Sequence, residues 1–399
     1  SWAMSSGKRK LSRNTGGGRS WKTFDGPCWK AGWARSPHVS PVCRGLSIID
    51  WPIAVKKNVP LREPNEHILK FQMREDVNAR LGRLLGPEFQ KYRREFEKAQ
   101  SAPATGEVPE FPLFLTMELI NRCNLDCVMC YKAHHREPRA FLEQALVEKI
   151  LAECHDKRLP SLELGMGSEV LLYPGIREVI RRVGQVGILD VFFGTNGVLL
   201  NDEVIEEILA SRITRVKISL DAATRKTYQK VRGHDHLERT ERNIERIITL
   251  RNERRSPLPI IRVSFVVTAI NASEAGAFVE KWKDKVDYID FQRCIDFSCI
   301  DRPTLVDLQA VRHLTCAYPF YSLHVWADGA ITPCCTFYGK KLAVGNIRRD
   351  AIADVWCGEK MRRIRTEISG KNFNGICRQC LYFRDRILFG EKLFTVGEP

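Results

Sequence analysis

The 399-residue sequence lacks any apolar run close to the roughly 18 residues that a membrane-spanning helix needs. The basic stretch that begins at Lys8 leads into Gly, Ser and Trp rather than into an apolar segment, so we expect no secretory signal peptide. Acidic residues are fewer than basic ones, 48 against 63, which leaves a formal charge of +15. With 44% apolar residues the chain is too apolar to be largely disordered, so the sequence predicts a folded protein without a membrane partner.

The positive charge is concentrated near the start of the sequence. Residues 1–44 contain nine basic residues, one acidic residue and four of the eight tryptophans. A basic arm of this kind could bind nucleic acid. A poorly ordered tail is the simpler interpretation, so we expect no nucleic-acid partner.

Apolar spacing divides residues 45–399 into three parts. Residues 45–110 predict an N-terminal extension that is first irregular and then helical, with Gly86-Pro87 between two helices, a linker over 101–110 and no β-hairpin. Residues 111–300 alternate short apolar runs with amphipathic helices. The expected strands are Leu113–Leu119, Ser161–Leu164, Asp190–Phe193, Arg215–Leu220, Ile260–Val267 and Tyr288–Phe291. Residues 301–399 break this pattern and predict a small metal-stabilised domain.

Helices fit between these strands, at Leu142–Glu153, Ile176–Val186, Asp202–Leu209, Leu237–Arg251 and Glu274–Trp282. Six such βα units predict an α/β fold with a parallel sheet, either doubly wound and open or closed as a partial barrel. In both arrangements ligands bind beyond the C-terminal ends of the strands.

Fourteen cysteines in a chain of this size predict thiols that are reduced, buried or bound to metal. Cys123, Cys127 and Cys130 form a C-x3-C-x2-C loop directly after the first expected strand. Thiolates favour iron–sulfur clusters or zinc. A zinc ribbon needs a second C-x2-C about 15–20 residues further on, whereas the next pair is Cys377 and Cys380. Three ligands leave one iron of a [4Fe–4S] cluster open for chemistry.

This loop resembles the signature of the radical S-adenosylmethionine (SAM) superfamily, and the resemblance extends along residues 111–300. It implies a partial (β/α)6 barrel of the TIM type, in which the open iron holds SAM. Reductive cleavage of SAM would give a 5′-deoxyadenosyl radical that abstracts hydrogen from a substrate. The resemblance also implies a reductant of the flavodoxin or ferredoxin type. Because such clusters are oxygen-sensitive, we expect a cytoplasmic location.

Further stretches resemble the family's SAM-binding motifs. Gly165-Met166-Gly167-Ser168-Glu169 resembles the Gly-Gly-Glu motif that receives the SAM amino group, although Ser168 interrupts it. Ser219-Leu220-Asp221 resembles the segment that contacts the ribose. Taken alone these are ordinary turns and helix caps. The resemblance implies SAM contacts at Met129, Gly167, Ser168, Glu169, Asn196, Ser219, Asp221 and Arg232.

The cysteine-rich C-terminal part resembles the SPASM or shorter twitch extension of this family. Asp328-Gly329 predicts a hairpin turn, and Cys334 follows five residues after the glycine. Cys316, Cys334, Cys377 and Cys380 make four ligands, enough for one auxiliary [4Fe–4S] cluster. Structural zinc on the same thiols is the alternative. Cys335 could replace Cys334, because adjacent residues on a strand face opposite ways.

The resemblance leaves the reaction open between oxidation, epimerisation and the linking of peptide residues. Cys294 and Cys299 lie near the end of the sixth strand, where either could donate hydrogen or simply pack, and Asp296 and Asp301 are read as loop carboxylates. Peptide-modifying relatives carry an N-terminal winged-helix module with strands, so the helical pattern of residues 45–100 favours a small molecule such as a sugar or aminocyclitol. A peptide-modifying maturase, an RNA-modifying enzyme and a non-catalytic iron–sulfur electron carrier remain alternatives.

Overall fold

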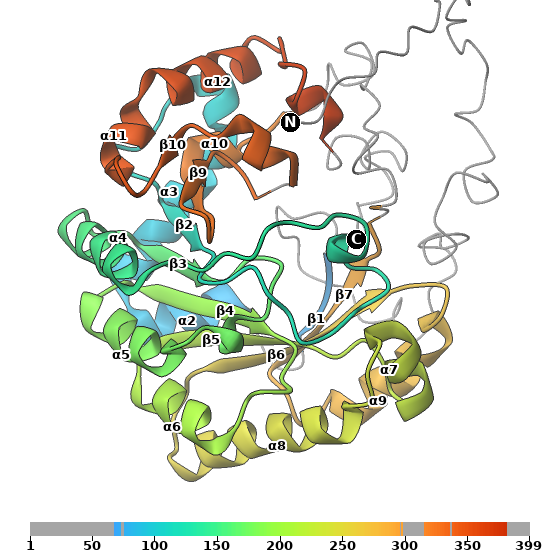
Figure 1. The fold of residues 1–399 in the computed structure, drawn as a ribbon. Helices are drawn as coiled ribbons and strands as arrows, with labels where there is room; N and C mark the ends of the chain where they lie inside the picture. Colours follow the sequence, from blue (N-terminus) through green and yellow to red (C-terminus); the bar gives the residue numbers. More distant parts are fainter. Residues whose placement is uncertain (1–67, 73–75, 296, 298–314, 336, 381–399) are drawn as a thin grey trace, which may run out of the picture.

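A computed structural model describes residues 68–72, 76–295, 297, 315–335 and 337–380 (Figure 1). The basic arm of residues 1–44, Asp296, Cys299 and Asp301 lie outside the described residues. Within the described ranges, no helix is both long and apolar enough to span a bilayer.

A ten-stranded sheet with the order β1-β7-β6-β5-β4-β3-β2-β8-β9-β10 organises the chain. The strands are β1 (Ile68–Gln72), β2 (Phe114–Met117), β3 (Ser161–Leu164), β4 (Asp190–Thr195), β5 (Ile213–Ser219), β6 (Ile260–Val267), β7 (Tyr288–Arg293), β8 (Ser322–Val325), β9 (Ala330–Thr332) and β10 (Gly345–Asn346). Strands β2 to β7 are parallel, and each pairs with the next one along the chain. In a doubly wound sheet the order of the strands along the sheet would reverse midway. The uninterrupted order from β2 to β7 is instead that of a partial (β/α)6 barrel and confirms the predicted fold class.

Helices connect the strands and cover the outside of the sheet (Figure 1). The α-helices are α2 (Val77–Leu85), α3 (Pro87–Thr105), α4 (Gln144–Asp156), α5 (Ile176–Val186), α6 (Asp202–Ala210), α7 (Arg225–Arg232), α8 (Leu237–Glu253), α9 (Ala275–Trp282), α10 (Tyr318–Tyr321), α11 (Ile352–Cys357) and α12 (Glu359–Ser369). Short 3-10 helices are η3 (Tyr131–Ala133), η4 (Val170–Leu172), η5 (Ala272–Glu274), η6 (Phe337–Leu342) and η7 (Cys377–Gln379).

Two periodicities place the core outside the barrel wall and polar groups inside it. Along α5, apolar residues recur every three or four positions and are buried against the sheet, at Ile176, Val179, Ile180, Val183 and Val186. Along β5, Val216 and Ile218 are buried under the helices, while Lys217 and Ser219 alternate with them and line an interior cavity. The interior of the barrel is therefore the place for chemistry.

The N-terminal extension differs from the prediction. Ile68–Gln72 is a strand that pairs antiparallel with β7, and the first helix among the described residues begins at Val77. Apolar residues at spacing i, i+3 had favoured a helix, but the open edge of β7 offers backbone partners that sequence spacing does not reveal. Helix α3 continues to Thr105, so the predicted linker over 101–110 is helical in its first half. The helix break at Gly86-Pro87 is confirmed.

The C-terminal part is joined to the barrel through the sheet. Strand β8 pairs in parallel with β2, and β9 then pairs antiparallel with β8. The turn between β8 and β9 is the predicted one, with Gly329 at φ 89°, a conformation that favours glycine. The cysteines after β9 are thereby held beside the first strand of the barrel, from whose other end the C-x3-C-x2-C loop begins.

Candidate functional site

The three cysteines of the C-x3-C-x2-C loop line one cavity of about 380 Å³ at the C-terminal ends of the strands. Cys123 is exposed, Cys127 is buried and Cys130 is half-buried. Although Cys123 as a residue is exposed, the surrounding protein atoms partly desolvate its thiol and raise its pKa to about 11. Binding of a metal cluster would therefore have to supply the free energy of deprotonation. Two backbone hydrogen bonds, from Asp126 N to Arg232 O at 3.3 Å and from Val128 N to Val231 O at 3.0 Å, tie the loop to the end of α7.

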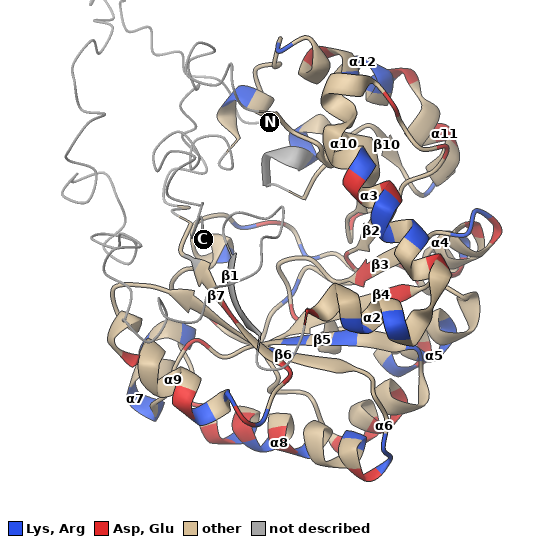
Figure 2. Cartoon of the chain, turned by 180° about the vertical axis from the view of Figure 1, so that it is seen from behind, with Lys and Arg blue, Asp and Glu red and all other residues tan. Residues whose placement is uncertain are grey.

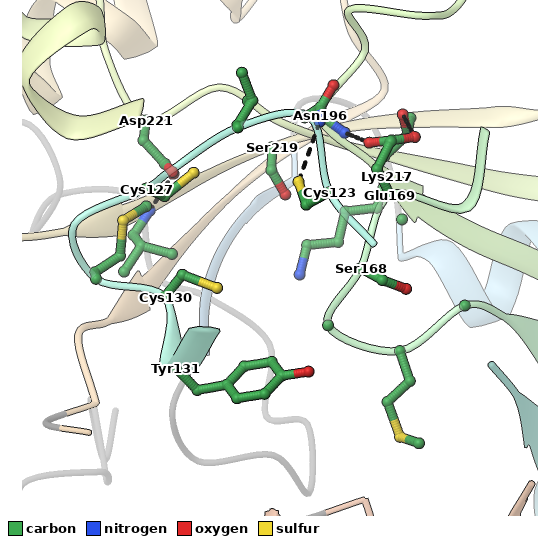
Figure 3. Close-up of a pocket in the computed structure, with 18 of the residues that line it drawn as sticks. Cys123, Cys127, Cys130, Tyr131, Ser168, Glu169, Asn196, Lys217, Ser219 and Asp221 are labelled. Atoms are coloured by element: carbon green, nitrogen blue, oxygen red, sulfur yellow. Dashed lines mark hydrogen bonds between the residues drawn. The ribbon is translucent and has the colours of Figure 1, made fainter. Parts of the chain in front are cut away.

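All eight residues predicted to contact SAM line this same cavity, although they come from five separate segments. Gly167 has φ 66°, and a Cβ there would lie 2.9 Å from a ring carbon of Tyr131, so the backbone passes close to the tyrosine. The hydroxyl of the neighbouring Ser168 is buried and has no hydrogen-bond partner in the described chain. A buried polar atom without a partner costs stability unless a ligand or water satisfies it. Ser168 therefore has a hydroxyl to offer a ligand (Figure 3).

Glu169 lies against the cavity but is engaged by the chain itself. One carboxylate oxygen accepts from Thr195 Oγ1 at 2.7 Å and Leu171 N at 3.1 Å, and the other accepts from Asn196 N at 2.7 Å. Burial raises the pKa of this carboxyl group, while these hydrogen bonds act in the opposite direction. Glu169 thus fixes the turn after β4. A contact between Glu169 and SAM stays a prediction.

The turn that Glu169 fixes reaches the cysteine loop. The amide of Asn196 donates to Asn124 Oδ1 at 2.8 Å and lies 3.7 Å from Cys123 Sγ (Figure 3). Backbone N–H of Glu169 donates to Arg122 O at 2.7 Å, which links the same two loops a second time. The ends of β2, β3 and β4 are therefore locked together around Cys123.

Arg232 and Asp221 form a buried ion pair beside Cys127. Their Nη2 and Oδ2 atoms are 2.6 Å apart, and Arg232 Nη1 donates to Cys127 Sγ at 3.4 Å. Asp221 has φ 61° and also accepts from Val266 N at 2.6 Å. The guanidinium of Arg232 thus already donates to one thiol, and in its predicted contact with SAM it would serve both SAM and Cys127. Ser219, the remaining residue of this segment, lies 3.3 Å from Ser264 between their hydroxyl oxygens.

Replacing Asp221 with alanine should lower the free energy of unfolding by about 3 kcal/mol, because the buried Arg232 loses its counter-charge. Anaerobic thermal unfolding measures this as a large fall in Tm. The exposed pair Arg246–Asp202 supplies the control, since Arg246→Ala should leave Tm unchanged. Equal shifts in the two variants would contradict a structural role for the buried pair.

Two charged residues of the cavity escaped prediction from the sequence. Lys217 on β5 and Glu163 on β3 both line it, and Figure 3 shows Lys217 extending between Cys123 and Ser168. The side-chain amine of Lys217 has no hydrogen bond or ion pair within the described part of the chain. Burial, followed by the charge of Arg262 on the neighbouring strand, lowers the pKa of Lys217 to about 8. A charged residue inside the apolar run Arg215–Leu220 is the signal that could have revealed it.

The C-terminal thiols gather in a second group. Burial raises the pKa of Cys316, and the charges of Cys334, Cys380 and Cys377 raise it further, which places these four together. Cys335 has different neighbours, because its thiol interacts with Cys334, Glu163 and Tyr318 rather than with Cys316, Cys377 and Cys380. The arrangement favours Cys334 over Cys335 as the fourth member of the group.

Among the residues that the structure describes, no three Cys, His, Asp or Glu side chains are close enough to hold a single metal ion. The three thiols of the first group and the four of the second supply the thiolate donors that iron–sulfur clusters use. Cys294 is buried at the end of β7 but does not line the cavity, unlike its neighbours Ile295 and Phe297, so its role as a hydrogen donor stays a prediction.

Known proteins resemble this chain in sequence. A protein of Pyrococcus furiosus named "Tungsten-containing aldehyde ferredoxin oxidoreductase cofactor-modifying protein" is 24% identical over 298 residues, which cover 62% of this chain and 81% of that one. A "Probable GTP 3',8-cyclase" of Methanothermobacter thermautotrophicus is 28% identical over 130 residues, 33% of this chain and 42% of that one. The match thus spans less than half of that cyclase.

Solved structures with a similar arrangement include BtrN in complex with AdoMet and 2-DOIA, which is 16% identical with a TM-score of 0.45. That match covers 69% of this chain and 94% of BtrN. Streptococcus suis SuiB bound to precursor peptide SuiA is also 16% identical, with a TM-score of 0.48 and coverage of 70% of this chain and 71% of SuiB.

Two family models match the chain in the regions that hold the two groups of thiols. The model described as the radical SAM superfamily matches residues 117–256, and the SPASM model, an iron–sulfur cluster-binding domain, matches residues 316–381. They imply SAM with a [4Fe–4S] cluster for the barrel and an auxiliary iron–sulfur cluster for the C-terminal part. The chain belongs to the radical SAM superfamily and carries a SPASM domain.

Proposed function

We propose that this protein is a radical SAM enzyme that oxidises or epimerises a small polar molecule, such as a sugar or an aminocyclitol. The observation that carries the proposal is the polar barrel interior directly beside the three thiols, where Lys217 and Glu163 line the same cavity as Cys123, Cys127 and Cys130. When bound, SAM and its cluster supply the 5′-deoxyadenosyl radical that removes a hydrogen atom from the substrate.

The charges of the interior suit a substrate that is polar and close to neutral. Arg262 and Asp290 pair at 3.2 Å, and Glu163 accepts a hydrogen bond from Thr116 at 3.4 Å. Lys217 and Glu163 then add one potential charge of each sign.

For an alcohol substrate, the hydrogen atom would be abstracted from the carbon that carries the hydroxyl group. Lys217 would accept the proton of that hydroxyl group. One electron then remains, and the iron–sulfur centre held by the C-terminal thiols would accept it. The loss of one hydrogen atom, one proton and one electron balances the oxidation of an alcohol to a carbonyl. In epimerisation a hydrogen-atom donor, for which the Cys294 thiol is the predicted candidate, would instead return a hydrogen atom to the same carbon. Lys217 would then only orient the hydroxyl.

Lys217→Met should reduce substrate oxidation by about 100-fold, the lower end of what a positioned base contributes. In the unsubstituted enzyme the rate should rise as pH rises through about 8, because only the neutral amine accepts a proton. Slow cleavage of SAM without substrate should continue in the variant. Lys217→Arg keeps the positive charge but cannot act as a base, so it should be equally slow; full turnover in Lys217→Arg would contradict the proton transfer.

The proposed function is tested by supplying the anaerobic enzyme with deuterated sugars and aminocyclitols in parallel with deuterated peptides. Deuterium found in 5′-deoxyadenosine identifies both the substrate and the abstracted position. We expect transfer from a small molecule. Transfer from peptides alone would replace the proposal with the peptide-modifying alternative.

A further inference from the structure

Three carboxylates line the interior cavity, and they differ in how fully the chain engages them. Asp221 is paired with Arg232, and Glu169 accepts three hydrogen bonds. Glu163 accepts a single long hydrogen bond, from Thr116 Oγ1 at 3.4 Å, and has no ion pair with another described residue. Glu163 is therefore the carboxylate of this wall that keeps most of its acceptor capacity for a ligand.

The space beside Glu163 is open toward Lys217. Glu163 lies on β3 and Lys217 on β5, and Gly194 of the intervening strand β4 lies opposite Lys217. A Cβ at Gly194 would meet no atom within 4 Å other than those of its chain neighbours. Lys217 and Glu163 act on each other electrostatically, yet they form no ion pair in the described part of the chain. A ligand with two polar groups can therefore bridge the two side chains.

We propose that Glu163 binds an ammonium group of the substrate, which makes the substrate an amino alcohol whose amine lies near the hydroxyl group that reacts. The inference rests on the proposed function, because it takes Lys217 as the group that contacts this hydroxyl. Glu163 then acts as the residue that selects a cationic substrate over a neutral one.

The charge balance of the cavity favours a cation at this position. Because Arg232 is neutralised by Asp221, Lys217 is the remaining cation among the described residues that line the cavity. Burial raises the pKa of Glu163, and the charge of Lys217 is the largest effect in the opposite direction. The proposed proton transfer needs Lys217 as a neutral amine, which leaves Glu163 as a carboxylate without compensating charge on the cavity wall. A single ammonium group on the substrate restores the balance.

Other occupants suit this position less well. A hydroxyl group could donate to Glu163 but would bring no charge, and an anionic group would be repelled. A metal ion needs several ligands, and the described residues place no three Cys, His, Asp or Glu side chains around one point. The ammonium group of SAM is expected at the turn over residues 165–169, which follows the end of β3.

Carboxylates on the outside of the barrel supply a matched control. Figure 2 shows basic and acidic positions interspersed along α5, α6 and α8. One such pair joins Arg177 Nη1 and Glu203 Oε2 at 2.6 Å, and Glu203 is exposed. Glu203→Gln therefore makes the same chemical change as Glu163→Gln at a position away from the cavity.

The test is calorimetric titration of the anaerobic, cluster-loaded enzyme in the presence of SAM but without a reductant, so that no radical forms. The probes are matched pairs that differ in one amine or hydroxyl group, trans-2-aminocyclohexanol with trans-1,2-cyclohexanediol and glucosamine with glucose. We expect the amine of at least one pair to bind about 30-fold more tightly than its hydroxyl partner, the gain of a charge-assisted hydrogen bond. Glu163→Gln should remove this preference and Glu203→Gln should keep it, while both variants bind SAM normally.

Equal affinities for amine and hydroxyl probes in the unsubstituted enzyme would overturn the inference, as would amine binding too weak to measure at millimolar concentration. A preference that survives Glu163→Gln would also overturn it. Loss of SAM binding in Glu163→Gln would do the same, because the carboxylate would then serve SAM. Failure of the proposed function appears separately, as selective binding of an amine that gives no oxidised or epimerised product once the enzyme is reduced.

Discussion

Replacing Cys123, Cys127 and Cys130 with alanine should lower the iron content from about eight to about four per chain, the loss expected for one [4Fe–4S] cluster. Formation of 5′-deoxyadenosine should fall to background in the same variant. Both effects follow from the position of the three thiols, which line one cavity together with every residue predicted to contact SAM. Iron analysis and anaerobic product assays measure the two effects independently.

Cys357→Ala is the matched control for this variant, because Cys357 is an exposed cysteine outside both groups of thiols. It should keep all of its iron and its full rate of SAM cleavage. Cleavage that persists in the triple variant would sink the assignment of the site. Loss of the auxiliary iron in that variant would instead show that the two groups do not fold independently.

Replacing Cys377 and Cys380 with alanine should have the complementary effect. About four irons should again be lost, but SAM cleavage should survive because the cysteine loop is untouched. Oxidation of the substrate should stop, since the remaining electron has no acceptor. The expected result is therefore 5′-deoxyadenosine without oxidised product, measured in a single reaction mixture.

Cys335→Ala distinguishes the auxiliary group from its neighbour. Cys334 lies with Cys316, whereas Cys335 faces Glu163 and Tyr318. Cys335→Ala should therefore leave the iron content unchanged. Loss of iron in Cys335→Ala but not in Cys334→Ala would reverse the assignment of the fourth ligand. Oxidised product from the Cys377 and Cys380 variant would show that the auxiliary centre is not the electron acceptor.

Sequence patterns were sufficient for the barrel because its strands are short runs rich in buried apolar residues and its helices are amphipathic. The predicted strands Ser161–Leu164 and Ile260–Val267 and the predicted helix Ile176–Val186 have the bounds that the structure gives. Strand β1 escaped prediction because its partner β7 is more than 200 residues away. Edge pairing of this kind is decided by the tertiary structure rather than by local preference.

At the site, the sequence predicted which segments meet but not which atoms face the cavity. The motif around Gly167 left Ser168 and Glu169 equivalent, whereas the structure engages both Glu169 oxygens with backbone and threonine donors and leaves the Ser168 hydroxyl without a partner. The ion pair between Asp221 and Arg232 was likewise hidden, because it depends on how α7 returns to the cysteine loop. Lys217 was overlooked because the segment Arg215–Leu220 was used only to predict a strand, and the charged residue within it was not considered as part of the site.

The thiol-lined cavity is proposed to generate a radical from SAM. The direct measurement is the yield of 5′-deoxyadenosine when the fully loaded enzyme is reduced anaerobically in the presence of SAM. The account predicts at least one 5′-deoxyadenosine per chain, and none from the variant without Cys123, Cys127 and Cys130. Intact SAM beside a fully loaded and fully reduced cluster would contradict the account and leave the protein as an iron–sulfur electron carrier.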